Sequence, residues 1–146
     1  MPNIIDMIKQ VELLEDYEQA SQSLMDVVHV DPVTGGKLAL NILKSNSGDV
    51  YFRSFAFCML YRANRSAAFE YITKHSSTCD SEVFGSMLCE ISEDSGLYID
   101  SWEIQKAVSQ LKLALLQRSD IDIKSIGKNL HDFLEAYGDK SPPAQL

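Results

Sequence analysis

Residues 90–103, EISEDSGLYIDSWE, carry five carboxylates and no basic side chain, and they include a Tyr and the only Trp of the chain. Carboxylates grouped in this way can act as general acids or bases, bind a metal ion, or attract a positively charged partner. They can equally be the solvated end of one helix and the start of the next. The candidate site residues in this stretch are Glu90, Glu93, Asp94, Tyr98, Asp100, Trp102 and Glu103.

Acid–base catalysis or metal binding would need partners that the sequence does not supply. Glu90, Glu93 and Asp94 are spaced to share one region of a helix surface. A metal site between helices would need Glu-x-x-His pairs, and the sequence contains none. The three histidines are far apart, and the Cys four residues after His75 falls in a predicted loop. We therefore expect no catalytic residue, no metal and no cofactor.

Known enzyme signatures are also missing. The sequence has no phosphate-binding loop, dinucleotide-binding glycine motif, zinc-protease motif, nucleophile elbow or EF-hand loop. Its three cysteines form no Cys-x-x-Cys pair, so a disulfide framework or a zinc site is not expected. The sequence predicts a protein that is not an enzyme. An enzyme with a helical site that lacks any motif is the alternative.

The net charge of −8 is distributed in blocks along the chain. Residues 1–36 and 80–104 are strongly acidic, whereas residues 37–79 are basic. This pattern disfavours nucleic acid as the main ligand and favours a basic protein partner if the acidic faces are exposed. A second candidate surface lies in the first block, and it ranks below residues 90–103 because Tyr17 is its only aromatic neighbour. The acids of this second surface are Glu12, Glu15, Asp16 and Glu18.

The elements that must position these side chains are predicted to be helices joined by short turns, since no period-two strand pattern is present. The segment 49–64 is apolar almost all round, which is typical of a central helix covered on several sides. The clearest internal break is DPVTGG, residues 31–36. We expect Ser66 and Asp100 to cap helices, with Glu103 completing a capping box. The expected helices cover residues 4–14, 17–29, 37–45, 49–64, 66–76, 80–93, 100–118 and 125–137.

These helices predict an all-α fold in which about eight antiparallel helices form a short helical array or an irregular bundle. A chain of 146 residues can bury a core as a single domain, here residues 1–140, and residues 141–146 are expected to be a frayed tail. The N-terminal residues are acidic where a signal peptide would be basic, and no apolar run is long enough to cross a bilayer. We expect a cytoplasmic protein that does not bind a membrane.

Residues 47–96 resemble HEAT-like α-helical repeat proteins. The resemblance rests on an Asp before a helix that contains an Arg (Asp49 and Arg53), a short helix with AAFEYI, and a helix pair closed by an acidic turn. It covers about a third of the chain and lacks a second repeat of equal length. As a small, acidic, helical protein, the chain is also similar to the immunity proteins of bacterial contact-dependent growth inhibition and related polymorphic toxin systems.

The second resemblance implies a monomer that binds a cognate toxin domain in a 1:1 complex and neutralises it by occluding its active site or substrate cleft. Such toxins are often nucleases, whose clefts are basic because they hold phosphates. Carboxylates of residues 90–103 would then set the association rate, and Tyr98 or Trp102 would be the buried anchor. If the acids face outward, reversing Glu90, Glu93 and Asp94 to Lys should slow binding without destabilising the fold. The alternative function is a HEAT-like scaffold that joins other proteins without inhibiting an enzyme.

Overall fold

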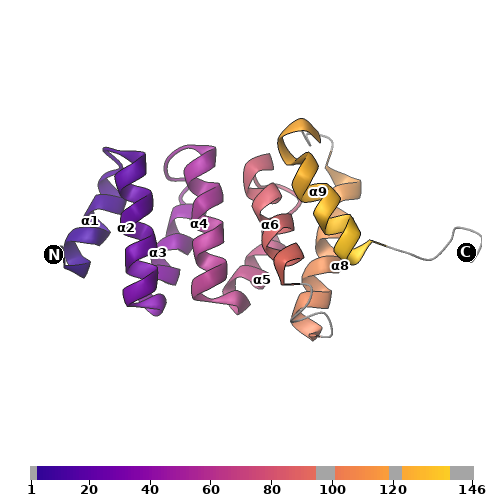
Figure 1. Ribbon diagram of the computed structural model, residues 1–146, viewed down its shortest axis with the longest axis horizontal. Helices are drawn as coiled ribbons and strands as arrows, with labels where there is room; N and C mark the ends of the chain where they lie inside the picture. The colour runs from indigo at the N-terminus through magenta and orange to yellow at the C-terminus, as the bar shows by residue number, and fades with distance from the viewer. Residues whose placement is uncertain (1–2, 95–100, 119–122, 139–146) are drawn as a thin grey trace, which may run out of the picture.

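The computed structural model describes residues 3–94, 101–118 and 123–138, and the predicted tail 141–146 lies outside them. The described residues form helices without any strand, which confirms the predicted all-α fold (Figure 1). None of these helices combines the length and the apolar composition that crossing a membrane requires. The helices are α1 (Ile4–Leu13), α2 (Tyr17–Val30), α3 (Pro32–Lys44), α4 (Val50–Ala63), α5 (Arg65–His75), α6 (Ser81–Glu93), α8 (Trp102–Gln117) and α9 (Ile123–Tyr137).

The first five helices each begin after an Asn or Asp whose side chain accepts a hydrogen bond from a backbone N–H of the first turn. Ser66, expected to cap α5, lies inside the helix because Asn64 takes that role. α8 begins one residue later than expected, with Ser101 at the cap position, and Glu103 accepts a hydrogen bond from Ser66. Asp100, the expected partner of Glu103 in a capping box, lies outside the described residues. The five capping residues are Asn3, Asp16, Asp31, Asp49 and Asn64.

The helices form two layers along the long axis of the molecule (Figure 1). α2, α4, α6 and α9 stand side by side in one layer, and α3, α5 and α8 lie behind them. α4 and α6 run in the same direction, because Arg53 pairs with Asp80 at their N-terminal ends and Tyr61 bonds with Asp94 at their C-terminal ends. Consecutive helices from α1 to α5 also pack on each other. The fold is therefore an array of stacked helix pairs rather than a closed bundle.

α4 lies at the centre of this array and packs against α2, α3, α5 and α6. Its buried side chains point to several sides, as the apolar segment 49–64 predicts. Aromatic rings continue the core from α4 into α5, since the rings of Phe57 and Tyr71 lie 6.2 Å apart and those of Tyr61 and Phe69 lie 5.7 Å apart. Each such ring contributes about 1.5–3 kcal/mol through the apolar area that it buries. α4 thus holds the neighbouring helices in register.

The DPVTGG segment is not the break that the sequence predicts. Asp31 alone separates α2 from α3, and α3 includes Pro32 and both glycines. Proline is compatible with the first helical turn because its missing N–H has no partner there in any helix. Gly35 lets α3 approach α2 closely, since a Cβ at this position would lie 2.5 Å from Val28 Cα. The glycine therefore serves helix packing rather than a loop.

Candidate functional site

The structure separates the acidic stretch into buried and exposed side chains. Glu90 and Asp94 are 9% and 5% exposed, whereas Glu93 between them faces solvent. Ser86, Glu90 and Asp94 follow one another at intervals of four residues, so they form one stripe on α6, and α4 covers that stripe. The expectation that Glu90 and Asp94 face outward is therefore wrong. The predicted site residues that lie outside the described part of the chain are Tyr98 and Asp100.

Asp94 connects three helices from inside the fold. Its carboxylate accepts hydrogen bonds from the Tyr61 hydroxyl at 2.5 Å and from Arg65 Nε at 2.9 Å. The Arg65 guanidinium also lies 5.4 Å from the centre of the Tyr61 ring. Burial, together with the bond to Asp94, raises the pKa of Tyr61 above its ordinary value, so the phenol remains a donor. Asp94 thus ties the end of α6 to α4 and α5.

Similar polar pairs continue along the contact between α4 and α6. The hydroxyls of Ser54 and Ser86 share a hydrogen bond, and one turn further along the Cys58 thiol and the Glu90 carboxyl influence each other's pKa. Burial raises the pKa of the Glu90 carboxyl, and burial together with the charge of Glu90 raises the pKa of the Cys58 thiol to about 12. A thiol with so high a pKa is a poor nucleophile. Polar residues spaced by three or four on α4 thus face polar residues spaced by four on α6. This matched spacing is the signal in the sequence that could have predicted the contact.

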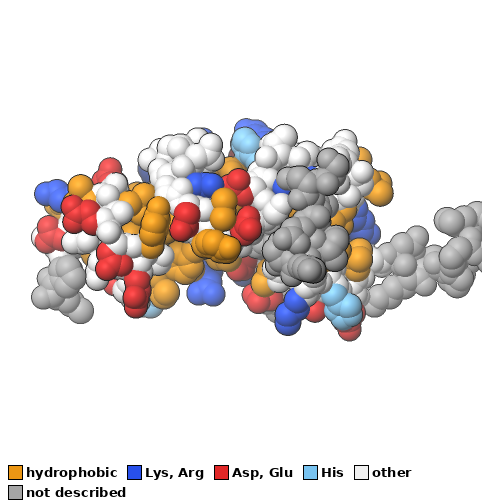
Figure 2. Space-filling view, turned by 90° about the horizontal axis from the view of Figure 1, so that it is seen from above, with side chains coloured by type: hydrophobic (Ala, Val, Ile, Leu, Met, Phe, Trp, Pro, Cys, Tyr) orange, Lys and Arg blue, Asp and Glu red, His pale blue; other side chains and the backbone are white. Residues whose placement is uncertain are grey.

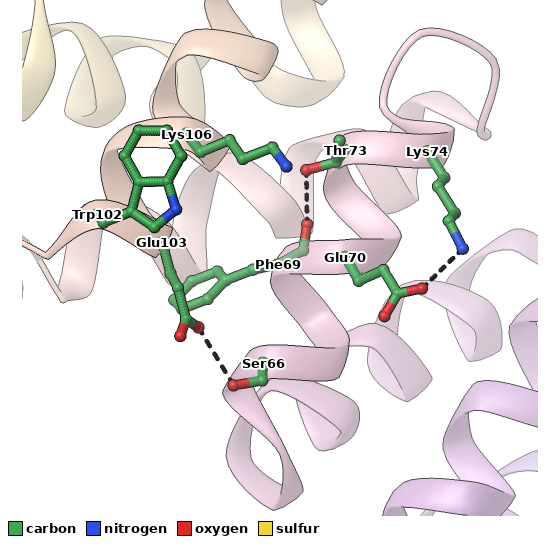
Figure 3. A pocket seen from close by; sticks show the side chains of 8 residues that line it. All are labelled: Ser66, Phe69, Glu70, Thr73, Lys74, Trp102, Glu103 and Lys106. Carbon is green, nitrogen blue, oxygen red and sulfur yellow. Dashed lines mark hydrogen bonds and ion pairs between the residues drawn. The ribbon is translucent and has the colours of Figure 1, made fainter.

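Trp102 and Glu103 line a groove of about 360 Å³ between α5 and α8, which we call the Trp102 groove (Figure 3). The Trp102 side chain is 75% exposed, so it is not part of the core. Phe69 contributes a largely buried ring to the same groove. Glu103 Oε2 accepts a hydrogen bond from Ser66 Oγ at 3.2 Å, which joins the N-terminal ends of the two helices. The groove therefore offers one exposed aromatic side chain to a partner.

Among the described residues, the charges that line the Trp102 groove are balanced rather than acidic. The groove is lined by two acids, Glu70 and Glu103, and by two bases, Lys74 and Lys106 (Figure 3). Lys74 pairs with Glu70 at 2.7 Å, and exposed pairs of this kind contribute little to stability. Glu93 lies in a different groove, between α6 and α9. The predicted site residues that the structure describes as exposed therefore belong to two separate surfaces.

The exposure of the single tryptophan gives a spectroscopic prediction. Trp102 should emit as a water-exposed indole, and acrylamide should quench it almost as efficiently as in the unfolded chain. Trp102→Ala should change the free energy of unfolding by no more than about 0.5 kcal/mol, because the side chain is outside the core. Urea denaturation followed by circular dichroism measures this second effect. A blue-shifted and protected emission would instead mean that the indole is buried.

The first acidic block, in contrast, is exposed on α1, on α2 and in the turn between them. No Lys or Arg side chain forms an ion pair with these acids within the described residues. Figure 2 shows acidic side chains gathered over this end of the molecule. Within the described residues, more carboxylates are thus exposed at this end of the chain than in residues 90–103. We call these side chains the N-terminal acidic surface: Asp6, Glu12, Glu15, Asp16 and Glu18.

Other groups with reactive or ligating side chains do not form an enclosed site. Burial raises the pKa of the Cys79 thiol to about 11, and no bond joins this thiol to the His75 ring among the described residues. His131, Asp132 and Glu135 have ligand atoms within 4.8 Å of one another, but they lie on the solvent-facing side of α9. The carboxylate of Asp132 is already paired with a lysine at 2.8 Å. Neither group points to a reaction.

Comparisons with known proteins give no information on the function of this chain. Protein-family models, curated proteins and solved structures were each compared with the chain, and none gave a match. The fold, the Trp102 groove and the N-terminal acidic surface are therefore the features that bear on function. Of these, the N-terminal acidic surface has the most distinct chemistry, because its charge is all of one sign apart from Lys9.

Proposed function

We propose that this protein binds a basic toxin domain in the cytoplasm and neutralises it in a 1:1 complex by covering its active site or substrate cleft. The observation that supports this proposal is the N-terminal acidic surface, whose carboxylates are exposed and have no Lys or Arg partner among the described residues. Unpaired charges of one sign attract a partner of opposite charge. The cleft of a nuclease is such a partner, because Lys and Arg line it to hold phosphates.

Neutralisation of this kind needs no catalytic residue. Exposed carboxylates attract the partner over about one Debye length, roughly 8 Å at physiological salt. Once the surfaces meet, the inhibitor fills the cleft and nucleic acid cannot enter. A stacked array of helices suits this role, since preformed surfaces bind with little backbone rearrangement and a small loss of conformational entropy.

A scaffold that joins two proteins without inhibiting either is the second candidate. The Trp102 groove favours it, because this groove lies on other helices, has no net charge and exposes an aromatic anchor. Two surfaces with different chemistry suit two different partners. Co-expression with the toxin encoded beside this protein separates the two functions. Growth is restored only if this protein is an inhibitor.

Charge reversal is expected to show which acidic surface meets the partner. The triple variant Glu12→Lys, Glu15→Lys and Glu18→Lys should associate with the toxin domain about tenfold or more slowly at low salt, because like charges then face each other. The effect should shrink at high salt, where ions screen the charges. The dissociation rate should change less. Stopped-flow mixing at two salt concentrations measures both rates.

The matched control reverses three exposed acids elsewhere, Glu93, Glu103 and Glu135, and changes the net charge by the same amount. This control should associate almost as fast as the unchanged protein. If the control associates slowly and the first variant does not, the interface lies at residues 93–103 or on α9. Circular dichroism should show that both variants stay folded, because all six side chains face solvent.

A further inference from the structure

Two exposed tyrosines lie beside the N-terminal acidic surface. Tyr51 is 71% exposed and Tyr17 is 45% exposed, whereas tyrosine side chains are typically intermediate in burial. Both lie in the first turn of their helices, α4 and α2, which are neighbours in one layer of the array. We call this pair the aromatic edge. Figure 2 looks onto this end of the layer and shows apolar side chains next to acidic ones.

The Tyr17 ring of the aromatic edge is packed against α4, whereas Tyr51 projects from the first turn of α4 and is 71% exposed. The Tyr17 ring packs on Phe52, with the ring centres 5.8 Å apart. Gly48 has a φ of +74° and lies against both rings, since a Cβ there would be 2.8 Å from Phe52 and 3.1 Å from Tyr17. Arg53 fixes the same turn by donating to the carbonyl oxygens of Gly48 and Asn46. Little conformational entropy of the Tyr17 side chain is therefore lost when a partner binds here.

The charge around the aromatic edge indicates the chemistry of its partner. Asp16 and Glu18 flank Tyr17 in the sequence, and Asp49 precedes Tyr51 by two residues; all three acids are exposed. An aromatic face beside carboxylates attracts a cation, and Arg suits it best because the planar guanidinium both stacks and donates. A second copy of this chain would bring acids against acids, which disfavours self-association at this surface.

We infer that the aromatic edge is the docking site for an arginine-bearing surface of a protein partner. Arginine side chains stack on Tyr51 and Tyr17, and the carboxylates of Asp16, Glu18 and Asp49 accept their N–H groups. That the partner is a toxin rests on the proposed function. The location of the site rests on these residues alone. The acids then set the association rate, and the tyrosines set the lifetime of the complex.

An NMR titration of the full chain, labelled with nitrogen-15, tests the site with a peptide of alternating Arg and Gly. Amide signals near residues 16–18 and 48–52 should shift, and the shifts should weaken at high salt. Tyr51→Ala should weaken peptide binding about three- to fivefold, whereas Tyr51→Phe keeps the ring and should bind within about twofold of the unchanged protein. A peptide with Lys in place of Arg should bind more weakly.

Trp102→Ala is the matched control, because it removes an exposed aromatic side chain from another surface. The inference is wrong if the shifts map to the Trp102 groove or to α6 and α9, or if Tyr51→Ala binds the peptide like the unchanged protein. The urea midpoint of Tyr51→Ala should stay the same, so weaker binding is not a loss of fold.

If the peptide binds the aromatic edge but the toxin is not neutralised in cells, the site stands and the proposed function fails. Growth rescue that survives Tyr51→Ala together with Tyr17→Ala supports the function and overturns the site.

Discussion

Replacing Asp94 by Ala is expected to lower the free energy of unfolding by about 3 kcal/mol. The change removes the acceptor of the Tyr61 hydroxyl and of Arg65. Tyr61 is almost fully buried, so its hydroxyl would be left without a bond to that carboxylate and with little access to water. Arg65 is partly exposed and can be hydrated, which limits the loss. Urea denaturation followed by circular dichroism measures the change.

Glu93→Ala is the matched control, since it removes a carboxylate from an exposed position next to Asp94 in sequence. Its effect should stay within about 0.5 kcal/mol. Tyr61→Phe and Asp94→Ala together should cost less than the sum of the two single changes, because both remove the same hydrogen bond. Equal losses for Glu93→Ala and Asp94→Ala would mean that Asp94 does not tie the helices together.

The burial of Glu90 and Asp94 also changes what the triple charge reversal suggested by the sequence would measure. Lys in place of Glu90, Glu93 and Asp94 would bring two ammonium groups into the contact between α4 and α6. A buried charge without a partner costs several kcal/mol, so this variant would lose its fold before it tested any interface. Exposed acids are the suitable targets, and the two triple variants above contain only those.

Local signals in the sequence predict most of the helices, and the start of α3 in the DPVTGG segment is the exception. An Asn or Asp precedes most of them, and its capping bond involves only the next three residues. The segment 49–64 is apolar on all sides, and it becomes the central helix with neighbours on both sides and behind. These features act over a few residues, so a single sequence contains them. Such signals locate a helix end to within about two residues: the sequence predicts Ser66 as the cap of α5, and the cap is Asn64.

The burial of the acids depends on what covers them, and a single helix does not contain that information. Ser86, Glu90 and Asp94 form a polar stripe, which on an isolated helix is typical of the solvent-facing side. α4 covers this stripe with the hydroxyls of Ser54 and Tyr61, which bond to it, and with the Cys58 thiol. The match becomes visible only when the two helices are placed side by side. No helix in the described part of the chain covers the N-terminal acids, whose side chains are exposed.

Gly35→Ala is expected to destabilise the fold by about 2 kcal/mol, although alanine favours an isolated helix by about 1 kcal/mol. A Cβ at this position would lie 2.5 Å from Val28 Cα and 2.8 Å from Val28 N. Backbone atoms cannot rotate away as a side chain can, so α2 and α3 would have to separate and the core between them would loosen. Thermal and urea unfolding of the variant measure the loss.

Gly127→Ala is the matched control for this prediction, because Gly127 is also inside a helix but a Cβ there meets nothing within 4 Å. Helix propensity then acts alone, and this variant should be more stable by up to about 1 kcal/mol. Opposite signs at the two glycines are the expected result. If Gly35→Ala is also stabilising, α3 does not cross α2 closely, and DPVTGG is the loop that the sequence predicts. The contact between α2 and α4 would then rest on direct packing such as that of Tyr17 on Phe52, without the support of α3 against α2.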